Sequence, residues 1–233
     1  MARKIAVSAA PSRGWLDSVR PLIAAHVGDE SLLERRYHEL ITAAGRLFEQ
    51  KGFDRTTIEE IATELDLSVG AIYRYVERKE DILLLTLART LWLFQAEVGE
   101  ATADVHDAEE KLRRAIRIYF QNIGAYAHSA LLAYRESYVL TGDARRLLKD
   151  LERETNRIFE AIITDGIARG AFRRCRVDVA TYNIVMLAHT WALKRWYLGK
   201  VLSLDAYIDE QTEFVLLALR RRPVPAAAAR RRH

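Results

Sequence analysis

The 233-residue sequence contains a single cysteine, Cys175, and only four prolines. One thiol excludes an internal disulfide framework and suits a reducing compartment. The scarcity of proline leaves long helices uninterrupted, and a hydrophobic content of 50% argues against a disordered chain. Because Cys175 lies among arginines in the run RRCR, we interpret it as structural or incidental rather than as a redox switch.

The sequence also lacks the patterns of membrane proteins. No apolar run approaches the ~20 residues that a membrane-spanning helix needs. Arg3 and Lys4 are not followed by the sustained apolar core of a secretory signal. We therefore expect a soluble, cytoplasmic protein with no membrane partner.

Catalytic motifs are missing as well. The chain has no glycine loop for phosphates, no nucleophile elbow and no His-Glu zinc motif. Its six histidines are scattered without the spacing of metal ligands: His26, His38, His106, His128, His189 and His233. The sequence therefore predicts no enzyme, no metal site and no cofactor.

The net charge of +4 gives little information about partners. The C-terminal tail carries six arginines, so the rest of the chain is net negative: Arg220, Arg221, Arg222, Arg230, Arg231 and Arg232. Any case for nucleic-acid binding must depend on where individual cations lie.

The most informative segment runs from Thr57 to Lys79. Its apolar spacing predicts two short helices, Ile58–Leu65 and Val69–Val76, joined by a tight turn. Thr57 and Glu60 have the spacing of a capping box at the start of the first helix.

The turn and the second helix have an unusual composition. Asp66 falls where the chain must reverse and tolerates a left-handed backbone, and Ser68 can cap the second helix. Ile72 and Val76 are predicted to face inward. The opposite face would expose small, aromatic and cationic residues: Gly70, Tyr73, Arg74 and Tyr75. Such a helix-turn-helix is typical of proteins that bind DNA.

The run ITAAGRLFEQKGFDRTTIEEIATELDLSVGAIYRYVERKEDIL resembles the N-terminal domain of TetR family transcriptional regulators, over about Tyr37–Leu84. The resemblance implies an all-α fold, with a three-helix DNA-binding domain followed by a helical domain for effector binding and dimerisation. It implies phosphate contacts by Thr57, Tyr73, Tyr75 and Lys79. The full predicted DNA-binding set is Arg55, Thr57, Ser68, Val69, Gly70, Ala71, Tyr73, Arg74, Tyr75 and Lys79.

Four positions depart from the pattern common in that family. Asp66 stands where glycine is usual, and Val69 where lysine is frequent. Val76 replaces a frequent phenylalanine, and Arg78 a frequent serine cap. Val69 removes a cation and offers an apolar contact, for instance to a thymine methyl group. These changes leave the fold prediction intact and the operator sequence open.

We predict four regions: an N-terminal arm (1–30), the DNA-binding domain (31–78), the helical body (79–222) and a disordered tail (223–233). The arm has two interpretations: a terminus with one short packed helix near Trp15, or an arm whose Arg3, Lys4 and Arg13 enter a minor groove. The other predicted helices are Leu32–Lys51, Lys79–Val98, Ala108–Ala127, Ser129–Leu140, Asp143–Arg169, Val177–Leu198 and Ser203–Arg221.

The body supplies candidate effector-binding residues, mostly aromatic residues with polar tips, each of which could equally be ordinary core. Arg135 stands out because a cation inside an apolar segment must be paired or meet an anion. Its pairing with Glu136 is the alternative to an anionic ligand, just as a hydrogen-bonded core residue is the alternative for His189. The predicted set is Trp92, Tyr119, Phe120, Tyr126, Tyr134, Arg135, Tyr138, Phe159 and His189.

The last two helices carry more apolar surface than one core can use, which predicts a two-fold interface between copies. The runs WALKRWYLGK and LSLDAYIDE look like a TetR branch that includes regulators of fatty-acid and steroid breakdown, which respond to acyl-CoA. The resemblance implies a homodimeric repressor that leaves a palindromic operator on binding an apolar, acyl-CoA-like effector. The alternative is a helical small-molecule-binding or sequestering protein without specific operator binding.

Overall fold

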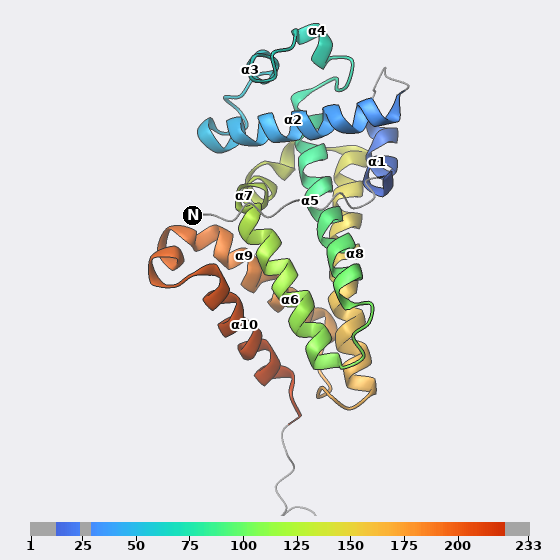
Figure 1. Ribbon diagram of the computed structural model, residues 1–233, viewed down its shortest axis with the longest axis vertical. Helices are drawn as coiled ribbons and strands as arrows, with labels where there is room; N and C mark the ends of the chain where they lie inside the picture. The colour runs from blue at the N-terminus through green and yellow to red at the C-terminus, as the bar shows by residue number, and fades with distance from the viewer. Residues whose placement is uncertain (1–12, 24–28, 222–233) are drawn as a thin grey trace, which may run out of the picture. The chain divides into compact units, whose positions relative to one another are not determined.

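A computed structural model describes residues 13–23 and 29–221 (Figure 1). Helices are the only regular elements of these residues apart from one isolated bridge between Phe172 and Arg220. This confirms the predicted all-α fold. The predictions for Arg3, Lys4 and the arginines beyond Arg221 lie outside the described residues.

The helices follow the predicted order. They are α1 (Arg13–Val19), η1 (Arg20–Leu22), α2 (Glu30–Lys51), α3 (Ile58–Glu64), α4 (Val69–Ile72), α5 (Lys79–Thr102), α6 (Ala108–Ala125), α7 (Ala127–Glu136), η2 (Ser137–Val139), α8 (Gly142–Ala168), α9 (Val177–Val201) and α10 (Leu204–Leu219). Helix α4 is half as long as predicted, because the chain turns after Ile72. Helix α9 is longer than predicted and is interrupted at Lys194, whose backbone is not helical.

The chain forms two compact units, whose limits differ from the predicted domain boundaries. The first comprises Met1–Ala96 and Tyr126–Thr155, and the second Glu97–Ala125 and Asn156–His233. The boundaries predicted from the sequence remain a prediction.

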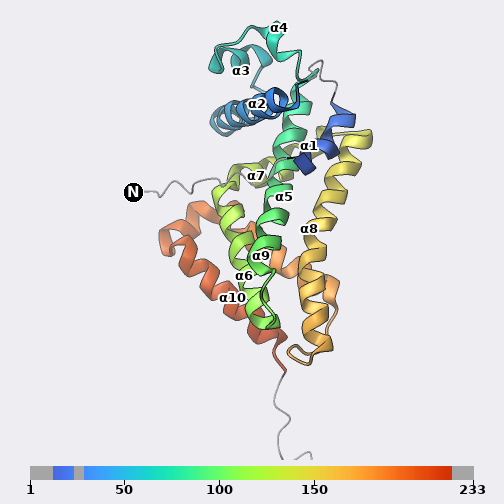
Figure 2. The same cartoon turned by 45° about the vertical axis from the view of Figure 1, so that its right-hand side comes forward.

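The first unit is built on α2 and the start of α5. Helices α3 and α4 lie on one side of α2, as both views show (Figures 1 and 2). Its core joins the inner faces of these helices; fully buried members include Tyr37, Leu40, Ile61, Ile72, Val76, Ile82 and Leu85.

The second unit is an aromatic-rich helical layer in which α6 packs against α9 and α10. Its glycines permit two close approaches. A methyl group on Gly166 would lie 2.2 Å from the ring of Phe172, and one on Gly124 would lie 2.4 Å from Leu204. The half-exposed thiol of Cys175 lies in the connection between α8 and α9.

Helix α5 is the one described helix long and apolar enough to cross a membrane by length and composition, contrary to the expectation from the sequence. Core helices of soluble proteins pass the same test, and 56% of its apolar window is buried inside the protein. Its first turns, from Ile82 to Leu85, belong to the core of the first unit.

Candidate DNA-binding surface and effector residues

The start of α3 is fixed by the predicted capping box. The amide of Glu60 donates to Thr57 Oγ1 at 3.3 Å, and the amide of Thr57 donates to Glu60 Oε2 at 2.9 Å. Lys51 pairs with the same carboxylate, and this contact is the largest cause of the lowered pKa of Glu60. The Thr57 side chain also contributes, after the backbone amide of Glu59, to the lowered pKa of the Glu59 carboxyl.

The turn between α3 and α4 also follows the prediction. Asp66 has a left-handed backbone with φ of 53°. The amide of Leu67 then donates to the carbonyl of Ala62 at 2.9 Å, which closes the turn. Ser68 Oγ accepts from the amide of Ala71 at 3.1 Å, so α4 begins at a side-chain cap.

Helix α4 presents a mixed outer face. Ser68, Gly70 and Arg74 are exposed, and Tyr73 is 45% exposed. A side-chain carbon on Gly70 would meet nothing within 4 Å, so the outer side of α4 is open at this point. Val69 and Ala71 are half-buried at the edge of this face. The structure thus brings six of the predicted DNA-binding residues together.

Tyr75 was predicted on the same exposed face, and that prediction is wrong. The side chain is 6% exposed, and its backbone carbonyl accepts from the Tyr37 hydroxyl at 3.2 Å. Burial raises the pKa of Tyr37 to about 12, which keeps this hydroxyl a donor. Because α4 ends at Ile72, the following turn carries Tyr75 into the core beside the fully buried Val76.

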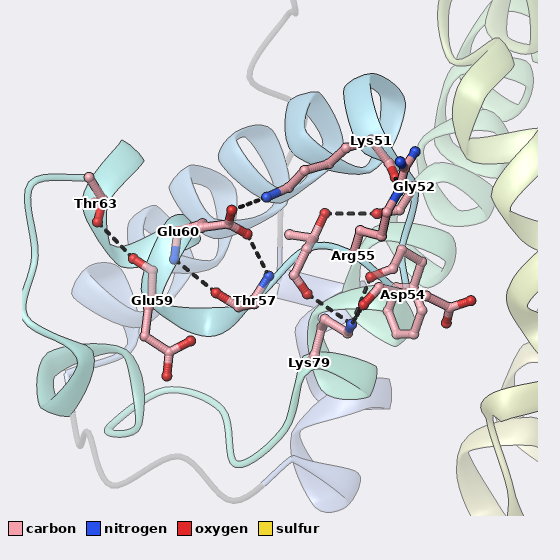
Figure 3. A network of polar contacts seen from close by, with 11 residues as sticks. Lys51, Gly52, Asp54, Arg55, Thr57, Glu59, Glu60, Thr63 and Lys79 are labelled. Atoms are coloured by element: carbon pink, nitrogen blue, oxygen red, sulfur yellow. Dashed lines mark hydrogen bonds and ion pairs between the residues drawn. The ribbon is translucent and has the colours of Figure 1, made fainter.

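Lys79, for which the resemblance implied a phosphate contact, makes contacts within the protein. Its ammonium donates to the carbonyls of Phe53, Asp54 and Thr56 at 2.7, 3.2 and 2.8 Å (Figure 3). It also lies 4.4 Å from the centroid of the Phe53 ring. An ammonium has three protons. All three are therefore engaged, and Lys79 ties the first turn of α5 to the turn between α2 and α3.

A carboxylate completes the start of α5. Asp81 Oδ2 accepts from the amides of Glu77 and Arg78, both at 2.9 Å. Arg78 replaces the frequent serine cap of the family, and Asp81 takes over that function from within the helix. Asp81 was not predicted from the sequence, although an acidic residue in the first turn of a helix is a known cap signal.

Two exposed cations of the predicted DNA-binding set remain for DNA, Arg55 and Arg74. Arg55 uses Nε on the carbonyl of Lys51 at 2.7 Å, which leaves its terminal nitrogens for a phosphate (Figure 3). Arg74 is exposed on the α4 face. Arg46, in contrast, donates to Glu64 at 3.3 Å. The surface is thus only locally cationic, as the sequence indicated.

Of the predicted effector residues in the second unit, Tyr119, Phe120 and Phe159 are buried, and His189 is half-buried. The Tyr119 hydroxyl lies 2.9 Å from His189 Nε2, and the Tyr119 ring meets Phe159 edge-on at 5.5 Å. Burial lowers the pKa of His189 to about 4, so the imidazole is neutral near pH 7. Phe120 lies 6.1 Å from Tyr207, ring centroid to ring centroid.

The predicted effector residues in the first unit divide into two groups. Trp92 and Tyr126 are half-buried, whereas Tyr134 and Tyr138 are 50% and 64% exposed. The Arg135 side chain is 72% exposed and lies 3.8 Å from the carboxylate of Glu136.

The expectation of a cation inside an apolar segment is therefore wrong for Arg135. Helix α7 turns Leu132 and Glu136 inward, one turn apart, and Arg135 outward. Glu136 is the buried member of the pair, so the ion pair weighed as the alternative is the arrangement that the structure contains.

Three polar groups of the interior were not singled out from the sequence. Asn156 Oδ1 and Thr181 Oγ1 are buried atoms of the described residues without a hydrogen-bond partner. Arg89 is half-buried on α5. No local motif marks these positions, because each depends on what neighbouring helices supply.

Comparison with known proteins agrees with this geometry. The family model "Bacterial regulatory proteins, tetR family" matches residues 40–85, and "Tetracyclin repressor-like, C-terminal domain" matches residues 105–218. The HTH-type transcriptional regulator HbdR of Aromatoleum sp. (strain CIB) is 38% identical over 184 residues, which cover 79% of this chain and 80% of HbdR.

Solved structures show the same fold. The ketosteroid transcriptional regulator KstR2 of Mycobacterium tuberculosis superposes with a TM-score of 0.68 at 20% identity, covering 85% of this chain and all of that one. AibR, solved in complex with isovaleryl coenzyme A and operator DNA, superposes with a TM-score of 0.67 at 19% identity. That match covers 77% of this chain and 97% of AibR.

Proposed function

This chain belongs to the tetR family of bacterial regulatory proteins and is a transcriptional regulator, and from that premise we propose a homodimeric, cytoplasmic repressor released from its operator by an acyl-CoA-like effector. The observation that carries the DNA-binding part is the outer face of α4, which two caps and the buried Ile72 hold in place. A capped, exposed helix behind a tight turn is the element that such regulators insert into a major groove.

The proposed contacts fall into two kinds. Thr57, Tyr73 and Arg55 hold phosphates and position the protein, without reading sequence. Ser68, Val69, Gly70, Ala71 and Arg74 approach base edges. Arg74 is the residue we assign to base recognition, because a guanidinium can make two hydrogen bonds to guanine.

The dimer interface is proposed on α9 and α10. Large apolar side chains are exposed along both helices: Val179, Tyr182, Met186, Trp196, Tyr197, Val201, Phe214 and Leu217. Contiguous apolar surface of this kind marks interaction sites in soluble proteins. Trp191 and Tyr207 of the same two helices are buried, and their ring centroids lie 5.3 Å apart within the unit. Two recognition helices of a dimer reach successive major grooves when the half-sites are about 34–36 Å apart.

The proposed effector class has two supports. AibR, which shares the fold, was solved with isovaleryl coenzyme A, and KstR2 is named for ketosteroid regulation. An effector that binds one arrangement of the helices better than another shifts the dimer away from its DNA-binding form.

The test is fluorescence anisotropy with the DNA upstream of the protein's own gene. We expect a complex at nanomolar protein whose affinity falls steeply with salt, and which competitor DNA of unrelated sequence does not displace. Arg74→Gln should change the preferred sequence, whereas Leu217→Glu should yield monomers in analytical ultracentrifugation and weaken binding. A helical sequestering protein would give no sequence-specific complex at any salt concentration.

A further inference from the structure

Arg89 is a half-buried cation of the first unit for which the described residues supply no partner. It lies on α5, ten residues after the helix begins, or about 15 Å along its axis. Of residues 13–23 and 29–221, none accepts a hydrogen bond from its guanidinium or pairs with it. A guanidinium keeps its charge in proteins, so burial cannot be relieved by losing a proton.

Arg36 of the same unit provides a direct comparison. It is also half-buried, and it donates to Glu39 at 2.6 Å. The hydrogen bond to Glu39 is the largest cause of the raised pKa of Arg36. Burial, in contrast, lowers the pKa of Arg89. Arg36 therefore has a carboxylate partner within the unit, whereas Arg89 has none among the described residues.

The charged surroundings of Arg89 come from α2 and from the start of α7. After burial, the groups that act on its pKa are Tyr126 and Glu34, and both raise it without making a hydrogen bond. The charge of Arg89 in turn lowers the pKa of His38, after burial. Glu34 and His38 lie one turn apart on α2. The charge of Arg89 therefore acts on α2, the helix against which α3 packs.

An aromatic side chain adjoins this cation. Trp92 is three residues further along α5, which places it on the neighbouring turn of the same side. It is half-buried and packs against the core of the first unit. A cation followed by an apolar aromatic surface suits a ligand that has a charged head and an apolar part.

We propose that Arg89 is the anion-binding residue of the effector site, and that the effector is an amphiphile with a carboxylate or phosphate beside Arg89 and an apolar group beside Trp92. This inference rests on the proposed function and moves the anion site predicted at Arg135 to a different helix. Hydrogen bonds between a guanidinium and an oxyanion are charge-assisted and roughly twice as strong as neutral ones.

The position of Glu34 gives the site a regulatory consequence. A bound anion neutralises Arg89 and repels Glu34, so it weakens the attraction between α5 and α2. Ligand binding therefore favours arrangements in which these helices are further apart. Such a differential effect is what a ligand needs in order to shift the DNA-binding equilibrium.

The experiment is isothermal titration calorimetry on the full chain without DNA, with four eight-carbon probes. Octanoate and octyl phosphate carry the two candidate heads, octan-1-ol is the uncharged match, and octanoyl-CoA tests a thioester that brings its own phosphates. We expect the anionic probes to bind at least about tenfold tighter than octanol.

Variants assign the difference to one residue. Arg89→Gln should weaken binding of the anionic probes by about 10- to 100-fold and leave octanol unchanged. Arg89→Lys should restore part of the loss, and Glu34→Gln should tighten anion binding. Arg135→Gln is the matched control and should behave like the wild type. Circular dichroism melting curves check that Arg89→Gln remains folded.

Three results would overturn the inference: equal affinity for octanoate and octanol, unchanged anion binding in Arg89→Gln, or no binding of any probe to the wild type. None of them depends on DNA. If anions bind through Arg89 and upstream DNA is not recognised, the proposed function fails while the site stands. If upstream DNA is recognised but anion binding does not depend on Arg89, the proposed site fails while the proposed function stands.

Discussion

The DNA-reading segment and the second unit are stabilised in different ways. Around α3 and α4, short helices are fixed by polar contacts at their ends: the Thr57–Glu60 cap, the Ser68 cap and the Lys79 tie. In the second unit, long helices are fixed by aromatic contacts along their sides, as between Tyr119 and Phe159. A helix of four residues buries too little surface to hold its position by packing, so its termini must do so.

The largest expected effect tests the aromatic side of this comparison. Phe159 is fully buried, and Phe159→Ala should lower the free energy of unfolding by about 3–5 kcal/mol, through lost burial and a residual cavity. Urea denaturation followed by circular dichroism measures it. Tyr134→Ala, at a half-exposed aromatic position, is the control and should cost much less. Equal costs would show that aromatic packing does not stabilise the second unit.

A second prediction concerns the pH dependence of the same unit. The pKa of His189 is about 4 in the folded protein, against 6.5 as its ordinary value. The unfolded chain therefore binds more protons between these values, so stability should fall as pH decreases from 6.5 toward 4, by up to roughly 3 kcal/mol.

Urea denaturation at several pH values measures this loss. Comparison of the wild type with His189→Asn isolates the contribution, because the variant cannot titrate at this position. Parallel pH profiles for the two proteins would contradict a buried neutral imidazole.

A third prediction tests the polar contacts that fix the short helices, at Lys79. Lys79→Met should lower the free energy of unfolding by about 1.5–3 kcal/mol, since three carbonyls lose a charged donor. Because no ammonium proton is left for a phosphate, the salt dependence of DNA binding should keep its slope. Arg55→Gln is the counterpart: it should lower that slope by about one with little loss of stability. Anisotropy titrations over a salt series measure both slopes. A reduced slope for Lys79→Met would show that Lys79 contacts a phosphate after all.

The smallest effects come from a matched pair of caps. Ser68 and Ser203 cap α4 and α10 with nearly equal hydrogen bonds, at 3.1 and 3.2 Å. Replacing either with alanine should cost about 1 kcal/mol of stability. Only Ser68→Ala should also weaken DNA binding, because α4 lies at the proposed surface. If both variants bound DNA like the wild type, the side-chain caps would have no part in positioning α4 for DNA binding.

The sequence predicted the polar ends of the helices well, because caps depend on residues three apart in the chain. The Thr57–Glu60 box, the left-handed Asp66 and the Ser68 cap are all confirmed.

Side-chain roles that depend on distant residues were not predictable in the same way. Tyr75 is buried because α4 ends early, and Lys79 is engaged by carbonyls 23 to 26 residues earlier in the chain. Arg135 is exposed although it lies in an apolar segment, since helical periodicity does not tell which face of a helix its neighbours cover. The effector residues and the domain limits remain predictions for the same reason.

The half-exposed thiol of Cys175 gives the chain a natural attachment point. Because it is the only cysteine, a maleimide-linked nitroxide reacts at one place per polypeptide without prior substitution. Double electron–electron resonance on the labelled protein would yield one inter-label distance for each assembly of two copies. Recording that distance in frozen solution, with and without octanoate and with and without operator DNA, would show whether the two copies rearrange.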